Sequence, residues 1–114
     1  MPLLTINTNT AIDDKPATLA AASQLIASQL GKPESFVMVN IVDDLDMLFA
    51  GSSAPLAHLQ LKSLGLHSEQ TAELSATLCD WVSTQLAIPT ERIYIEFAAP
   101  ERAFWGWNRS TFGS

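Results

Sequence analysis

The chain has 114 residues, 47% hydrophobic and 16% charged, and this balance predicts one compact globular domain over residues 1–114. Twelve acidic against six basic side chains give a net charge of −6, which disfavours binding to phosphate backbones, so no nucleic-acid partner is expected. No signal-peptide pattern opens the chain and no window approaches the ~20 apolar residues of a membrane span, so we expect a cytoplasmic protein without a membrane partner.

The first half of the chain predicts a strand, a helix and a second strand. Residues 3–6 form a short β-prone run. A helix is expected over residues 15–30, because Pro16 in the first turn favours its start and Gly31 favours its end. The run 36–42 is almost continuously apolar and β-branched, which predicts a central strand covered on both faces.

The second half repeats this order. Residues 47–49 could add a short edge strand, and residues 56–64 have the length and apolar content of a main strand. A second helix is expected from Ser68 to Leu86, with Pro89 after it, and a last main strand over residues 93–97.

The repeated strand–helix–strand order predicts an α/β fold built from two tandem βαβ units. They would share one four-stranded mixed sheet with both helices on one face. A mean hydropathy of +0.16 in so short a chain suggests that apolar surface is buried between subunits. The aromatic residues between Phe104 and Phe112 would then pack on a neighbouring subunit.

Proline at position 2 permits removal of Met1, which would leave a secondary amine at the start of the chain. An α-amine titrates near pH ~8 in model peptides, and burial or a nearby cation lowers its pKa toward neutrality, where it can act as a base. A proline at this position taken alone is better explained by ordinary N-terminal processing.

Further short motifs resemble the macrophage migration inhibitory factor family in the same order along the chain. Any one of them is nonspecific, but the ordered set covers essentially the whole chain. They are Pro2 followed by Leu-Leu-Thr-Ile-Asn-Thr-Asn, Gly31-Lys32-Pro33, Phe49-Ala50-Gly51-Ser52-Ser53 with Pro55, Ser63-Leu64-Gly65, Arg92-Ile93-Tyr94-Ile95, and Gly106-Trp107-Asn108 with Ser110-Thr111-Phe112.

This resemblance implies a barrel-like homotrimer with active sites at subunit boundaries. The implied activity is keto–enol tautomerisation of small aromatic α-keto acids such as phenylpyruvate, with dopachrome-like substrates also considered, and with no cofactor or metal. The implied site residues are Pro2 as catalytic base, Lys32 for the substrate carboxylate, Leu64 through a backbone amide, Tyr94 lent by the adjacent subunit, and Trp107, Met38 and Phe112 as apolar walls. Without the resemblance, Lys32 would be a solvated lysine. Ordinary core or interface packing remains an equal alternative for Trp107 and the favoured one for Met38 and Phe112.

Two positions depart from the family pattern. Glu96 stands where better-known members have an asparagine at the far end of the substrate, and an ionised carboxylate there accepts but does not donate hydrogen bonds. Preference among aromatic substrates is therefore open. Leu56-Ala57-His58-Leu59 replaces the CxxC of mammalian members, so we predict no thiol-oxidoreductase activity.

Other functions remain as alternatives. Animal members of the family are cytokines exported without a signal peptide, so a secreted signalling protein is one alternative, and a noncatalytic trimer is another. His58 and His67 have no companion ligands at metal-binding spacing, so no metal site is expected.

Overall fold

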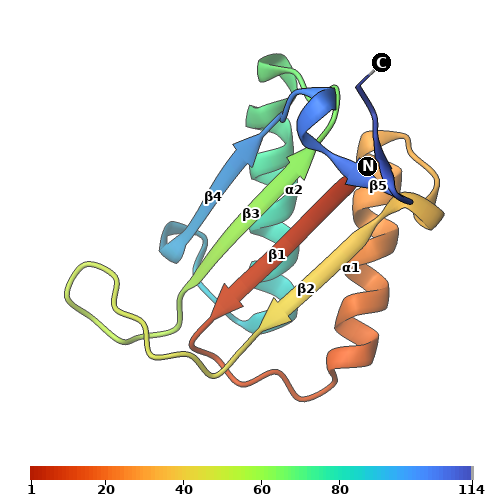
Figure 1. Cartoon of the computed structure of the whole chain (residues 1–114). Coiled ribbons are helices and arrows are strands. Elements are labelled where there is room, and N and C mark those ends of the chain that lie inside the picture. The colour runs from red at the N-terminus through yellow and green to blue at the C-terminus, as the bar shows by residue number, and fades with distance from the viewer. Residues whose placement is uncertain (114) are drawn as a thin grey trace.

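The computed structural model describes residues 1–113. They form a four-stranded main sheet, and both helices lie against one of its faces (Figure 1). The main elements are β1 (Pro2–Thr8), α1 (Lys15–Leu30), β2 (Met38–Val42), β3 (Ala57–Ser63), α2 (Ser68–Leu86) and β4 (Ile93–Ala98), followed by the small strands β5 (Gly106–Trp107) and β6 (Ser110–Thr111). None of the described helices is both long and apolar enough to cross a membrane.

The sheet confirms the tandem arrangement. Its strand order is β2-β1-β3-β4, with β1 parallel to β2 and β3 parallel to β4. The two βαβ units meet where β1 runs antiparallel to β3, from the pair Pro2–Ser63 to the pair Thr8–Ala57. This antiparallel junction sets Pro2 beside the end of β3, next to the segment that carries Leu64.

The core lies between the sheet and the helices. Alternate residues of β1 and β3 are buried, as expected for strands with one covered face. Burying each large apolar side chain of this kind contributes roughly 1.5–3 kcal/mol relative to leaving it exposed. The fully covered members include Leu4, Ile6, Ile26, Leu59, Leu61, Leu78 and Val82.

The end of α1 determines where Lys32 lies. Gly31 adopts a left-handed conformation with φ of 62°, which glycine reaches without a Cβ clash, and the Lys32 amide donates to the Ala27 carbonyl at 3.0 Å. At the other end of α1, Asp14 accepts a hydrogen bond from the Ala17 amide. The turn after Gly31 therefore places Lys32 at the end of the sheet where β1 begins.

Two expectations about strands were wrong. Residues 36–42 do not form a central strand, because β2 begins at Met38, pairs only with β1 and exposes Met38 and Val42 on the face away from the helices. Only one face of this strand is thus covered within the chain, where Val39 and Ile41 pack against the core. Residues 47–49 form no edge strand; Phe49 pairs only with Ser52 across a tight turn.

Candidate active site

Pro2 opens β1 and is buried, with Met1 half-buried in front of it. In the full chain the Pro2 nitrogen is part of an amide, and the free α-amine belongs to Met1. The Met1 residue lines two adjoining pockets, each of about 410 Å³. The beginning of the chain thus lies at the junction of these two pockets.

One of the two pockets, here called the cationic pocket, carries two basic side chains. It is lined by Met1, Lys32, Pro33, Phe36, Leu64, Gly65, Arg102 and Phe112. The Lys32 ammonium donates to the Leu64 carbonyl oxygen at 3.1 Å, and this bond holds the ammonium beside the N-terminus. An anionic group of a ligand would find positive charge here and no acidic side chain in the lining.

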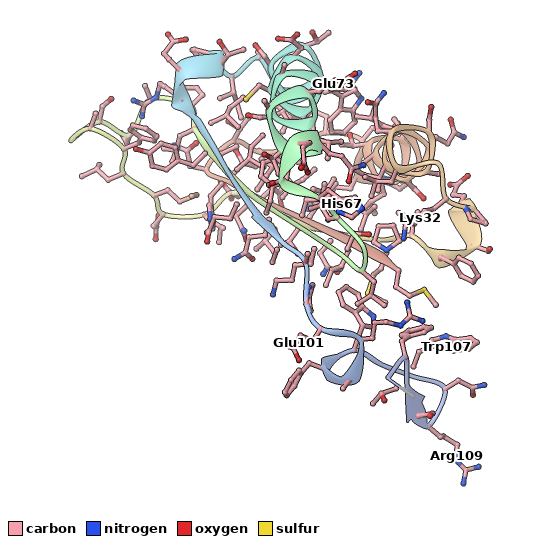
Figure 2. All side chains as sticks on the ribbon, turned by 90° about the horizontal axis from the view of Figure 1, so that it is seen from above. Lys32, His67, Glu73, Glu101, Trp107 and Arg109 are labelled. Atoms are coloured by element: carbon pink, nitrogen blue, oxygen red, sulfur yellow. The ribbon has the colours of Figure 1, made fainter. Side chains whose placement is uncertain are left out.

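The other pocket, here called the aromatic pocket, is mainly apolar. Its walls include Pro2, Phe36, Met38, Trp105 and Trp107. Trp107 stacks on Phe112 with ring centroids 6.1 Å apart and an interplanar angle of 14°, so the two pockets share aromatic packing. Figure 2 shows Lys32 just after α1 and Trp107 in the C-terminal segment. The pair of pockets suits a ligand with an anionic head and an aromatic tail.

The environment lowers the pKa of the N-terminal α-amine, which belongs to Met1 in the full chain. Burial is the largest cause, followed by the positive charge of Lys32 and a hydrogen bond with its side chain, and then by the charge of Arg102. All of these disfavour the protonated amine. The amine is therefore held closer to the neutral form that accepts a proton.

Four of the sequence-predicted site residues, Pro2, Lys32, Leu64 and Trp107, meet at this place, and so do Met38 and Phe112. Tyr94 and Glu96 do not. They lie on β4, opposite His58 and Gln60 of β3, toward the other end of the sheet from the Pro2–Ser63 pair. Within one chain these two side chains contribute to neither pocket.

Tyr94 and Glu96 have partners of their own. The Tyr94 ring packs on Phe49 with centroids 4.7 Å apart, and the Glu96 carboxylate pairs with the His58 imidazole. Tyr94 nevertheless leaves 65% of its surface exposed. In residues 1–113 no group of three or more His, Cys, Asp or Glu side chains is placed to hold a metal ion.

Arg102, Phe36 and Trp105 were missed by reasoning from the sequence. Phe36 lies in a 3-10 turn, Glu34–Phe36, and lines both pockets. Arg102 and Trp105 come from the C-terminal segment, which folds back on itself. The Arg102 Nε donates to the Phe112 carbonyl at 3.1 Å, and the Phe112 amide donates to the Trp105 carbonyl at 3.1 Å. The aromatic composition of this segment was the only available signal.

Comparisons with known proteins agree with the fold over nearly the full length. The sequence model of the family described as macrophage migration inhibitory factor (MIF) matches residues 1–113. A macrophage migration inhibitory factor of Xenopus tropicalis is 38% identical, with 98% of this chain and 99% of the relative covered. A homolog from Trichinella spiralis is also 38% identical, with coverage of 98% and 100%.

A solved structure gives the same answer. The crystal structure of a macrophage migration inhibitory factor homologue from Prochlorococcus marinus matches with a TM-score of 0.92 and 37% identity, and covers 97% of this chain and 99% of that one. The chain belongs to the macrophage migration inhibitory factor family.

Proposed function

We propose that this protein is a keto–enol tautomerase that acts on small aromatic α-keto acids of the phenylpyruvate type, with the Pro2 nitrogen as its base after Met1 is removed. The observation that carries the proposal is the meeting of Pro2, Lys32 and an aromatic pocket at the beginning of β1. Removal of Met1 would both free the amine and open the junction of the two pockets, because Met1 lines each of them.

The reaction needs one proton acceptor that can return the proton. The neutral Pro2 amine takes a proton from the carbon next to the carbonyl, and the electron pair of that C–H bond becomes the new carbon–carbon double bond. The carbonyl electrons move to oxygen, which then receives the proton from the Pro2 ammonium. Lys32 binds the carboxylate, and its charge, which lowers the pKa of the Met1 α-amine in the full chain, would favour the neutral form of a Pro2 amine in the same way.

We further propose that the active form is a homotrimer, in which Tyr94 and Glu96 complete the site of an adjacent subunit. Support comes from the sheet face away from the helices, where Met38, Val42 and Tyr94 are exposed large side chains. A patch of this kind is typical of a surface that another chain covers.

The decisive experiment uses purified protein with an intact N-terminus that carries no tag. Tautomerisation of phenylpyruvate and of a dopachrome ester is measured for the processed chain and for a form that retains Met1. Activity of the processed form alone supports the proposal, whereas absence of activity from both forms contradicts it.

A secreted signalling role is the second candidate, because the relatives above are named for an effect on macrophage migration. A trimer without catalytic activity is a third. The signalling role predicts that the Met1-retaining form acts as well as the processed form in a migration assay. The noncatalytic trimer predicts that neither form tautomerises phenylpyruvate.

A further inference from the structure

The cationic pocket holds more positive charge than one carboxylate requires. Lys32 and Arg102 both line it, and none of its other lining residues is acidic. The ion pairs found among residues 1–113 are Lys15–Asp43 and His58–Glu96, so neither pocket cation is paired with a carboxylate. In a chain with twice as many acidic as basic residues, two unneutralised cations in one pocket favour an anionic ligand.

Arg102 is oriented by a single hydrogen bond. Its Nε donates to the Phe112 carbonyl at 3.1 Å, and the described residues supply no acceptor for its two terminal nitrogens. A guanidinium presents its N–H groups as a planar fork, so fixing Nε also limits where the other donors point. These donors can therefore bind ligand oxygens without first breaking a bond within the protein.

The separation of the two pockets assigns these cations to one end of the ligand. The aromatic pocket, with Phe36, Trp105 and Trp107, accommodates an aryl tail and has no charged side chain in its lining. The cationic pocket is left for the α-keto acid head. That head has one negative charge in the keto acid and two in the enolate that forms when the proton leaves.

We propose that Arg102 and Lys32 form a two-cation site for the dianionic enolate of an α-keto acid, with Lys32 on the carboxylate and Arg102 on the enolate oxygen. This inference rests on the proposed tautomerase function and adds a residue to it. Arg102 contributes when the carbonyl electrons move to oxygen, before the Pro2 ammonium returns the proton. Charge-assisted bonds that strengthen as the enolate forms stabilise the transition state more than the bound substrate.

Oxalate tests this site without turnover, because its two adjacent carboxylates mimic the charge of an α-keto acid enolate. Phenylacetate serves as the comparison, since it carries an aryl ring and one carboxylate. Both are titrated by calorimetry against the processed wild-type protein and the Arg102→Gln and Arg102→Lys variants. Arg109→Gln is the matched control, because Arg109 belongs to the same C-terminal segment, lines neither pocket and points away from the body of the molecule in Figure 2.

Arg102→Gln should weaken oxalate binding about 10- to 100-fold, the loss expected for a charge-assisted hydrogen bond, and weaken phenylacetate binding less than about 3-fold. Arg102→Lys should lose less, and Arg109→Gln should change neither affinity. With phenylpyruvate, Arg102→Gln should lower kcat about 10- to 100-fold with little change in KM.

Equal weakening of both ligands, no weakening of oxalate, or no oxalate binding to the wild-type protein would overturn the two-cation site. Failure of the proposed function looks different. A wild-type protein that binds oxalate through Arg102 but does not tautomerise phenylpyruvate would support the anion site and contradict the tautomerase.

Discussion

The Glu96 carboxylate is paired with the His58 imidazole across strands β3 and β4, and 65% of the Glu96 side chain remains exposed. If Glu96 completes the site of an adjacent subunit, as proposed, the ligand there meets the carboxylate together with its imidazole partner. A test of Glu96 therefore has to include His58.

We expect Glu96 to disfavour phenylpyruvates with an anionic or electron-rich group at the far end of the ring. Glu96→Asn should narrow the difference in kcat/KM between hydroxylated and unsubstituted phenylpyruvate, because it removes the charge and supplies a donor. His58→Gln should widen this difference in kcat/KM, because the carboxylate then loses the imidazole that pairs with it. Unchanged ratios in both variants would show that neither side chain faces the ligand.

Arg92 is expected to hold Tyr94 in place through Phe49. The guanidinium donates to four carbonyl oxygens of the 49–55 loop, those of Phe49, Ser52, Ala54 and Pro55, at 2.9–3.2 Å. It also lies 5.3 Å from the centre of the Phe49 ring, which packs on Tyr94. Arg92→Met should therefore loosen both the loop and the tyrosine ring.

Tyr94 is the only tyrosine of the chain, so fluorotyrosine labelling gives one NMR resonance that reports on this ring. Arg92→Met should shift or broaden that resonance and speed amide exchange in the 49–55 loop, while Arg109→Met leaves both unchanged. If Tyr94 serves a neighbouring site, Arg92→Met should also raise KM for phenylpyruvate. An unaltered resonance would mean that Arg92 does not position the ring.

A homotrimer should be present at micromolar concentration, with a mass about three times 12.3 kDa by light scattering. Val42→Glu places a charge on the exposed face of the edge strand β2 and should shift the protein toward monomer with loss of tautomerase activity. Ser28→Glu places the same charge on the exposed side of α1 and should leave the assembly intact. A stable, active wild-type monomer would contradict the shared site.

The helices and the strand–helix–strand repeat could be predicted from the sequence because their signals are local. Gly31 ends α1 by a conformation that its own backbone favours, and the strand–helix–strand repeat restricts the sheet to few arrangements. The position of β2 could not be predicted in this way. An apolar run predicts burial on both faces without indicating whether the cover belongs to the same chain, and β2 leaves Met38 and Val42 open in the single chain.

The site was predictable where resemblance pointed to particular residues and not where it depended on how the C-terminal segment folds back. Lys32 and Leu64 follow short motifs next to element ends, and they lie together as expected. Arg102 belongs to no motif, and it reaches the pocket because the C-terminal segment folds back, with its side chain bonded to the Phe112 carbonyl. Tyr94 and Glu96 line neither pocket of the single chain, so their place in a site shared with a second subunit stays a prediction.

Changes at the N-terminus test whether the Pro2 amine is the base. Pro2→Ala and Pro2→Gly leave a primary, more flexible amine and should lower kcat by roughly 10²–10⁴-fold, as for a displaced general base. Retaining Met1 leaves the Pro2 nitrogen in an amide, which cannot accept a proton, and should abolish activity. Arg109 lines neither pocket, so the control variant Arg109→Gln should change neither kcat nor the pH profile.

Lys32→Ala removes a cation that lowers the pKa of the neighbouring α-amine, so the pKa of the base should rise. Because the base acts only when neutral, the acid limb of the kcat/KM profile should move to higher pH, and the loss of activity should be greatest at low pH. Lys32→Arg should keep the limb near its wild-type position, because it preserves the charge. A limb that stays in place in Lys32→Ala, measured across the profile with phenylpyruvate, would show that burial and Arg102 lower the amine pKa without Lys32, and that Lys32 serves only to bind the carboxylate.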